Sequence, residues 1–254
     1  MKLVLATHTM GQSYEWVESV DSTNSDLMRR ADSLPDGHLL IAEHQTAGKG
    51  RLGRRWQDRK GASLCLSLLL RPQQPFSDPG VLPLVFGLGC AEGLRAATGV
   101  EIGLKWPNDL VLHVAKLAGL LCESRPCESG MAYVCGIGVN LGQTAQDFED
   151  LPHAISLAMA GVSASPLSLA AAMVESFESV YDRWREDGFA AILDDYSALC
   201  VTLGKPVRIL READSFEGTA TSVLPDGQLL VRTAAGDYPV RSGEVSVRGL
   251  YGYL

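Results

Sequence analysis

The pattern of apolar and polar positions along residues 1–141 predicts a sheet with few helices. Short apolar runs, and stretches that alternate apolar with polar residues, predict strands at 1–6, 14–20, 38–43, 61–70, 102–106, 110–112, 116–123 and 132–139. Helical spacing predicts helices at 25–33 and 78–98. Because the strands follow one another closely, we expect them to pair nearly in sequence, in a mixed and mainly antiparallel sheet flanked by helices.

The helix expected at 78–98 is mostly apolar, yet it contains Gly87 and Gly89. Each glycine costs about 1 kcal/mol against alanine inside a helix, so we expect close packing against the sheet there. Its apolar part, residues 81–94, contains a proline and a glutamate and is shorter than the roughly 20 residues of a membrane span. We therefore expect no membrane partner.

The second half of the chain changes character twice. Apolar side chains recur at three- and four-residue steps over 166–199, which predicts a long helix and a second, short helix after Gly188. From residue 201 the pattern becomes short strands divided by turns. We predict an α+β protein of two domains, a larger one at 1–200 and a small β-barrel or sandwich at 201–254.

Charge and cysteine content narrow the possible functions. The chain has 254 residues, a net charge of −8 and six cysteines that lack metal-ligand spacing. The acidic balance argues against nucleic-acid binding by the whole surface. The cysteines argue against a disulfide framework and a structural zinc site. We expect a cytoplasmic protein whose own residues hold no metal.

An unusual concentration of glycine and positive charge lies at residues 44–56. It comprises Gly48, Gly50 and Gly53, which let the backbone approach a ligand, and Lys49, Arg51, Arg54 and Arg55, which can bind phosphate or carboxylate oxygens. The run 48–53 matches G-x-G-x-x-G, but a strand is expected after it instead of a helix, and Arg71 stands where an acidic residue is needed. Lys49 is followed by glycine, which excludes a P-loop. We interpret this stretch as an anion-binding loop.

Further polar groups interrupt the apolar strands, and strand ends of one sheet can meet at a single cleft. They are Ser22-Thr23-Asn24, Lys105-Trp106-Pro107-Asn108-Asp109, Lys116-Leu117-Ala118-Gly119 and Gly136-Ile137-Gly138-Val139-Asn140. No nucleophile–base pair is recognisable, so the residues suit electrostatic and positional catalysis on a phosphate, including adenylation of a carboxylate. A helix cap at 22–24 and solvated strand edges at the two lysines are the simpler readings.

These motifs together resemble those of the biotin protein ligases. The groups at 22–24, 45–56, 105–109, 116–119 and 136–140 occur in that family's order, with a helical segment and a small β domain after them. The resemblance implies a class II synthetase-like biotin/lipoate ligase catalytic domain with a small C-terminal SH3-like β-barrel. It implies that biotin and ATP with Mg²⁺ form biotinyl-5′-adenylate, and that biotin then passes to a lysine of a biotin carboxyl carrier protein.

The resemblance also implies roles for individual residues. Arg51 and Lys116 would be catalytic, with Arg51 stabilising the adenylate and Lys116 meeting the biotin carboxylate and the α-phosphate. The biotin site would comprise Ser22, Thr23, Asn24, Gln45, Lys49, Gly50, Arg51, Lys116, Gly119, Gly136 and Gly138. The ATP and adenylate site would comprise Gly48, Lys49, Arg51, Arg54, Trp56, Lys105, Asn108 and Asn140. Many members carry Arg at the position of Lys49, where lysine keeps the charge but loses the bidentate fork.

Two alternatives share this scaffold: a lipoate-protein ligase or octanoyltransferase, and a non-enzymatic biotin or nucleotide sensor. The 105–109 and 45–56 motifs favour biotin, and a sensor would not need Arg51 and Lys116. The catalytic motifs begin close to Met1, so we expect neither an N-terminal DNA-binding domain nor a nucleic-acid partner. The protein is expected to be a monomer or a homodimer, the latter through a sheet edge at 132–139.

Overall fold

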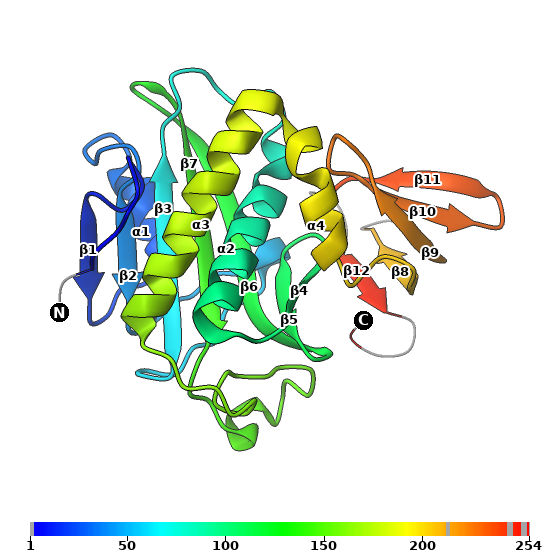
Figure 1. Cartoon of the computed structure of the whole chain (residues 1–254), viewed down its shortest axis with the longest axis horizontal. Coiled ribbons are helices and arrows are strands. Elements are labelled where there is room, and N and C mark those ends of the chain that lie inside the picture. Colours follow the sequence, from blue (N-terminus) through cyan, green and yellow to red (C-terminus); the bar gives the residue numbers. More distant parts are fainter. Residues whose placement is uncertain (1–2, 212–213, 243–245, 250–252, 254) are drawn as a thin grey trace.

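A seven-stranded sheet forms the centre of this computed structural model, which describes residues 3–211, 214–242, 246–249 and 253 (Figure 1). Within these residues its strand order is β1-β2-β3-β7-β6-β5-β4. The strands are β1 (Tyr14–Val17), β2 (Leu39–Ala42), β3 (Ser63–Leu70), β4 (Ile102–Lys105), β5 (Asp109–Leu112), β6 (Ala115–Cys127) and β7 (Gly130–Asn140). Strands β1 and β2 are parallel and the other neighbours are antiparallel, which confirms the predicted mixed, mainly antiparallel sheet.

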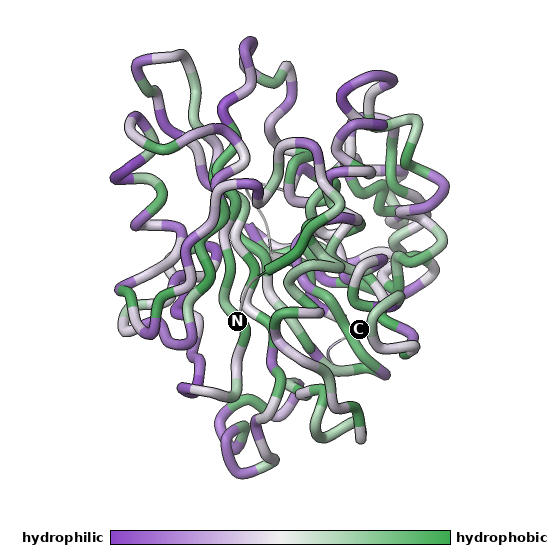
Figure 2. Tube along the Cα trace, turned by 60° about the vertical axis from the view of Figure 1, so that its left-hand side comes forward, coloured by the Kyte–Doolittle hydropathy of each residue, from purple (hydrophilic) through white to green (hydrophobic). Residues whose placement is uncertain are grey.

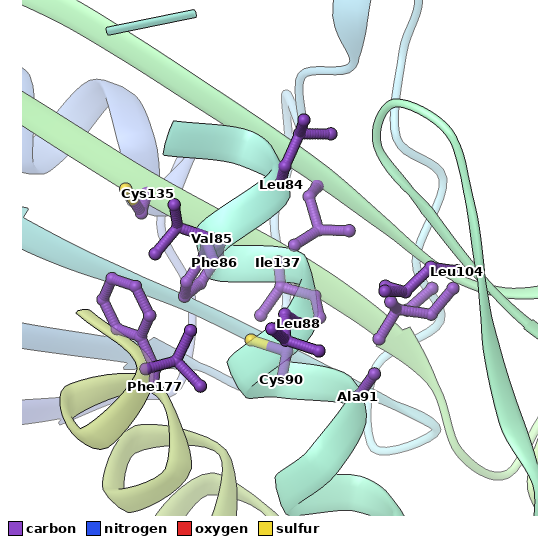
Figure 3. Packing of buried hydrophobic residues seen from close by; sticks show 14 of the residues in the cluster. Leu84, Val85, Phe86, Leu88, Cys90, Ala91, Leu104, Cys135, Ile137 and Phe177 are labelled. Atoms are coloured by element: carbon purple, nitrogen blue, oxygen red, sulfur yellow. The ribbon is translucent and has the colours of Figure 1, made fainter. Parts of the chain in front are cut away.

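Two long helices, α2 (Leu82–Thr98) and α3 (Pro166–Asp187), lie side by side over one face of this sheet (Figure 1). The short helix α4 (Leu193–Leu199) follows a single turn that begins after Gly188, as predicted. Apolar side chains from both helices and from alternate strand positions form the main core (Figure 3). Within it the Phe86 and Phe177 rings meet edge to face, with centroids 4.9 Å apart.

The glycines of α2 are explained by a helix–helix contact and only partly by the sheet. A Cβ on Gly89 would lie 2.4 Å from the Cα of Phe177 in α3, and one on Gly93 would lie 2.3 Å from the carbonyl oxygen of Ala172. A Cβ on Gly87 would meet Leu104 of the sheet at 3.5 Å, which is ordinary contact. For Gly89 the predicted close approach exists, but its partner was wrong: Gly89 and Gly93 let α2 touch the backbone of α3. Gly87 faces the sheet, as predicted, at an ordinary contact distance.

The other face of the sheet is only partly covered by a helix. Helix α1 (Thr23–Arg30) packs Leu27 there against Leu40, Leu69 and Val134 in a second, small core. The side chain of Ser22 accepts a hydrogen bond from the backbone of Ser25 and caps the helix. The rest of this face, over β7, β6 and β5, is left for other segments.

Two sequence predictions about strands were wrong. Residues 3–6 form no strand, because the backbone of Leu3 bonds to the Tyr14 hydroxyl and that of Ala6 to Glu175; residues 1 and 2 lie outside the described residues. The stretch 132–139 is no sheet edge, because β7 pairs with β3 on one side and with β6 on the other. The outer strands of the sheet are β1 and β4.

The C-terminal part is an antiparallel sheet of five strands in the described residues, in the order β11-β10-β9-β8-β12. These are β8 (Pro206–Leu210), β9 (Ser215–Val223), β10 (Leu229–Thr233), β11 (Gly236–Val240) and β12 (Ser246–Gly249). No pairing between β11 and β12 occurs among the residues described, so closure into a barrel stays a prediction. The boundary at residue 200 also stays a prediction. Just after it, the Thr202 hydroxyl accepts from the Trp106 N–H at 3.0 Å, which joins the two parts of the chain there.

Hydrophobic segments run along the central strands, and hydrophilic ones concentrate in the loops (Figure 2). The helical stretch Pro79–Thr98 has the length and apolarity of a membrane span, but 67% of its most apolar window is buried inside the protein. Its apolarity is therefore that of a core helix between the sheet and α3.

Candidate active site

A row of glycines forms the floor of the site, on the sheet face opposite α2 and α3. Gly138 of β7 lies between Cys65 of β3 and Gly119 of β6 in the strand register. A Cβ on Gly138 would lie 2.3 Å from the Trp56 ring, and one on Gly119 would lie 3.0 Å from Nζ of Lys116. The missing side chains thus let Trp56 and Lys116 lie directly on the sheet.

A small polar cavity of about 20 Å³ opens above this floor. Its lining includes Ser22, Thr23, Asn24, Gln45, Lys49, Trp56, Gly119, Gly136 and Gly138. The backbone and hydroxyl groups of Thr23 both donate to Oε1 of Gln45, at 2.8 and 3.1 Å. Helix α1 and the start of the glycine-rich loop are therefore joined by buried hydrogen bonds at this cavity.

The loop at residues 44–58 folds back on itself between its two ends. Lys49 and Arg55 form an isolated antiparallel bridge, and the tip is a short 3₁₀ turn, Arg51–Gly53. Leu52 at the tip has φ of 56° and is 58% exposed. The buried Asp58 carboxylate fixes the base, because it accepts from the Gln45 backbone at 3.1 Å and lies 3.0 Å from Nδ1 of His44. No long helix follows the glycines, as predicted, and β3 begins at residue 63.

A larger cavity of about 390 Å³ adjoins the small one, with Lys49, Trp56 and Gly119 in both linings. Seven of the eight residues predicted to bind ATP or the adenylate line it: Lys49, Arg51, Arg54, Trp56, Lys105, Asn108 and Asn140. Gly50, Lys116 and Gly119, which were predicted for the biotin site, line it too. They come from the loop, the ends of β4 and β7, the turn before β5 and the start of β6. Tertiary folding thus brings five separate segments to one cavity.

Two lysines and one carboxylate form the charged wall of this cavity. Nζ of Lys116 lies 2.6 Å from Oδ1 of Asp109, and the Tyr253 hydroxyl donates to the other oxygen at 2.5 Å. Burial by itself would raise the pKa of Asp109, but Lys116 and Tyr253 hold it below its usual value. Nζ of Lys105 lies 3.7 Å from the centre of the Tyr253 ring, and burial lowers the Lys105 pKa to about 8. The wall carries more positive than negative charge, so it suits a polyanion.

Arg51 reaches from the loop tip to the opposite side of the cavity. Its guanidinium donates to Oδ1 of Asn108 at 2.9 Å and to the backbone oxygen of Ser242 in the C-terminal part. The Asn108 amide nitrogen donates to the Leu120 carbonyl at 3.1 Å, so the oxygen of that amide is the end turned to Arg51. Burial lowers the pKa of Arg51, although the guanidinium stays charged.

Two residues of the predicted motifs lie elsewhere. Gly48 lines a groove on the outer side of the loop instead of the large cavity, and a Cβ there would lie 2.7 Å from the Trp56 carbonyl oxygen. Trp106 is buried in the core, and its indole N–H donates to Gly227 in the C-terminal part at 3.1 Å. The two residues shape the loop and the contact between the parts of the chain.

The sequence did not single out several residues at these cavities. Ser67 and Glu123 contact Asn24 beside the small cavity, and His153, Arg248 and Tyr253 line the large one. Asp109 lay within a recognised motif but had no assigned role. Ser67 lies inside an apolar run and Tyr253 far along the chain, so only strand register and tertiary contacts reveal them.

Comparisons with known proteins agree with this geometry. Residues 16–140 match the Biotin/lipoate A/B protein ligase family, and residues 202–248 match the Biotin protein ligase C terminal domain. The chain is 31% identical over 254 residues to the bifunctional ligase/repressor BirA of Escherichia coli, covering 98% of this chain and 79% of BirA. It is 35% identical over 238 residues to the biotin–[acetyl-CoA-carboxylase] ligase of Mycobacterium tuberculosis, covering 90% of this chain and 86% of that one.

A solved structure, the biotin protein ligase from Aquifex aeolicus in complex with biotin and ATP, superposes with a TM-score of 0.82. The two chains are 28% identical, and the match covers 94% of this chain and 99% of the other. Sequence, fold and site therefore agree that this chain belongs to the biotin protein ligases of the biotin/lipoate protein ligase family.

Proposed function

We propose that the protein is an ATP-dependent biotin protein ligase that biotinylates a lysine of a biotin carboxyl carrier protein in the cytoplasm. The observation that carries the proposal is that Arg51, Lys105 and Lys116, from three segments, line one cavity that adjoins a small polar cavity. A carboxylic acid could lie with its carboxylate beside the cations of the larger cavity and its polar head group toward the small one, which at about 20 Å³ must widen to admit a ring. The relative bound to biotin and ATP supports the same pair of substrates.

In the first step a biotin carboxylate oxygen forms a bond to the α-phosphorus of ATP, and the bond to the leaving pyrophosphate breaks. Negative charge builds on the phosphoryl oxygens, where Arg51 and Lys116 would stabilise it. Lys105 and Asn108 would support the phosphate chain. The oxygens of Asn108 and Asp109 are of the type that Mg²⁺ prefers, but they are paired with Arg51, Lys116 and Tyr253. They would meet the Mg²⁺ of an ATP complex only if these contacts were exchanged.

In the second step the uncharged amine of the acceptor lysine attacks the carbonyl carbon of biotinyl-5′-adenylate. An amide forms, AMP leaves with the electron pair of the broken carbon–oxygen bond, and the amine loses a proton. Lys116 would again lie beside the charge that gathers on the leaving phosphate. Water must be excluded from the adenylate during this step, because hydrolysis would waste it.

The test is ATP–pyrophosphate exchange with biotin, with lipoate and with no acid. We expect exchange with biotin alone, and a fall of at least a hundredfold in Lys116→Ala because a charge-stabilising group is lost. Lys60→Ala is the matched control, since Lys60 pairs with Glu18 at the surface, outside both cavities. Exchange with lipoate but not biotin would establish the lipoate alternative, and no exchange at all would favour a sensor.

The loop at 44–58 is proposed to close over the bound adenylate. The tip of the loop spans the cavity, where Arg51 donates to Asn108 and to the backbone of Ser242, while Leu52 beside it is 58% exposed. We expect saturating biotin and ATP to slow tryptic cleavage after the loop arginines 51, 54 and 55. Cleavage at an unchanged rate would show that the loop does not respond to ligands.

A further inference from the structure

A row of polar side chains beneath helix α1 is not explained by folding alone. Ser67 of β3 is fully buried, and in the strand register it lies opposite Gly136 of β7, which in turn lies opposite Leu121 of β6. A Cβ on Gly136 would lie 1.9 Å from Oδ1 of Asn24. The glycine therefore lets the Asn24 side chain descend from α1 onto the sheet beside Ser67.

The contacts of Asn24 fix which way its amide points. Its nitrogen donates to the Leu121 carbonyl at 3.0 Å and to Oε2 of Glu123 at 2.9 Å, and both of these groups are acceptors. Its oxygen accepts from the Ser67 hydroxyl at 2.7 Å. Turning the amide over would place oxygen against oxygen at Leu121 and at Glu123, so Glu123 and Ser67 hold the oxygen on the Ser67 side.

The same hydroxyl also meets Thr23. Oγ of Ser67 lies 2.7 Å from Oγ1 of Thr23, while Thr23 directs its own hydroxyl and backbone N–H to Oε1 of Gln45. Ser67 has a single proton for two neighbouring oxygens, so one of them, on Thr23 or on Asn24, can still accept a proton from a ligand. The Gln45 side-chain oxygen accepts both hydrogen bonds from Thr23, so the amide nitrogen of Gln45 points to the other side, toward the loop.

Hydrogen-bond donors thus lie on one side of the small cavity and acceptors on the other. The indole N–H of Trp56 is buried and makes no hydrogen bond to an oxygen or nitrogen of the described residues, although the Trp56 and Gln45 side chains both approach the Cys65 thiol. The Gln45 amide nitrogen lies beside Gly48. Oxygens of Thr23 and Asn24 form the opposite side. A group with a carbonyl oxygen flanked by N–H, such as a cyclic urea, matches this arrangement. The ring of lipoate contains only sulfur and carbon, so it can make neither kind of hydrogen bond.

We propose that Ser67 and Glu123 are positioning residues for the head group of the bound acid: they fix the orientations of the Thr23 and Asn24 side chains and so select a urea. The inference rests on the proposed function and extends it to two residues that would not touch the reacting atoms. Glu123 also lies 4.0 Å from Nζ of Lys49, so the carboxylate that orients Asn24 faces the loop as well.

The test measures KM and kcat for biotin and for ATP in the exchange reaction of the full chain. Ser67→Ala should raise the KM for biotin about tenfold and leave the KM for ATP unchanged, because one oriented hydrogen bond to the head group is lost. It should raise the KM for 2-iminobiotin by a similar factor, because that analogue keeps the two ring N–H groups that would face Thr23 and Asn24. Ser63→Ala is the matched control: Ser63 is a buried serine of the same strand whose hydroxyl accepts from Gln143, away from the head-group cavity.

Two variants at Glu123 separate orientation from packing, and a side chain that is 32% exposed should tolerate both. Glu123→Ala should raise the KM for biotin several-fold, while Glu123→Gln, which keeps an acceptor oxygen for Asn24, should restore it. The inference is overturned if both variants change the KM alike or neither does, or if Ser63→Ala matches Ser67→Ala. A wild-type chain without biotin-dependent exchange would instead refute the proposed function, so the two failures are distinguishable.

Discussion

Lys105→Met should stabilise the empty protein while it weakens the use of ATP. Lys105 is only 5% exposed, and burial lowers its pKa from 10.5 to about 8. At about 1.4 kcal/mol per pKa unit, keeping the ammonium charged in the fold costs about 3 kcal/mol near pH 7. The contact with the Tyr253 ring at 3.7 Å offsets about 1–2 kcal/mol of this. The burial cost is the larger, so the variant should gain about 1–2 kcal/mol in its free energy of unfolding.

The stability gained by Lys105→Met should depend on pH. The folded-state pKa is the lower one, so the cost is fully present below pH 8 and disappears as the pH rises toward 10.5, where the unfolded lysine also loses its proton. Urea unfolding at several pH values should show the variant more stable at pH 7 and the difference closing above pH 8.

The same variant should raise the KM for ATP, since an apolar side chain would replace a cation that faces the phosphates. A Lys105→Met protein that is less stable than the wild type at pH 7, or a stability difference that does not change with pH, would refute the assignment of a buried, strained charge.

Two further predictions concern glycines. Gly89→Ala should lower the free energy of unfolding by about 1–3 kcal/mol, because its Cβ would lie 2.4 Å from the Phe177 backbone and this overpacking exceeds the gain in helix propensity. Gly87→Ala, whose Cβ meets its nearest neighbour at 3.5 Å, should be neutral or stabilising by up to about 1 kcal/mol, and equal effects in urea unfolding would contradict the close helix contact. Gly138→Ala should displace the Trp56 ring and raise the KM for biotin with the fold intact; an unchanged KM would show that the ring is not part of the biotin site.

The local motifs of the site could be predicted from the sequence because residues close together in the chain supply the functional groups of each motif. The loop around Lys49 and Arg51 combines glycine with positive charge within a few positions, and the absence of a helix after it follows from the adjacent apolar strand. The mainly antiparallel sheet followed from short connections between strands. Likewise, the turn at Gly188 and the change to short strands after residue 200 are local signals.

The position of β7 in the sheet is not determined by its own residues. Its apolar residues are compatible with an edge or with the interior of the sheet, and the local pattern predicted an edge. In the structure β7 lies between β3 and β6, a pairing between residues far apart in the chain. Which strand order forms depends on the total apolar surface that each order buries. The residues of a single strand do not determine that total.

The sequence by itself determined most strands of the central sheet, the main helices and the residues with the chemistry to bind an anion. Tertiary structure alone decided that Gly119, Gly136 and Gly138 form one floor, that Trp56 lies on it, and that Ser67 and Glu123 orient Asn24 from two different strands. The physical reason is that hydrogen-bond direction and close approach depend on distances of a few ångströms between side chains. Strand register and helix packing set those distances only when the whole chain has folded.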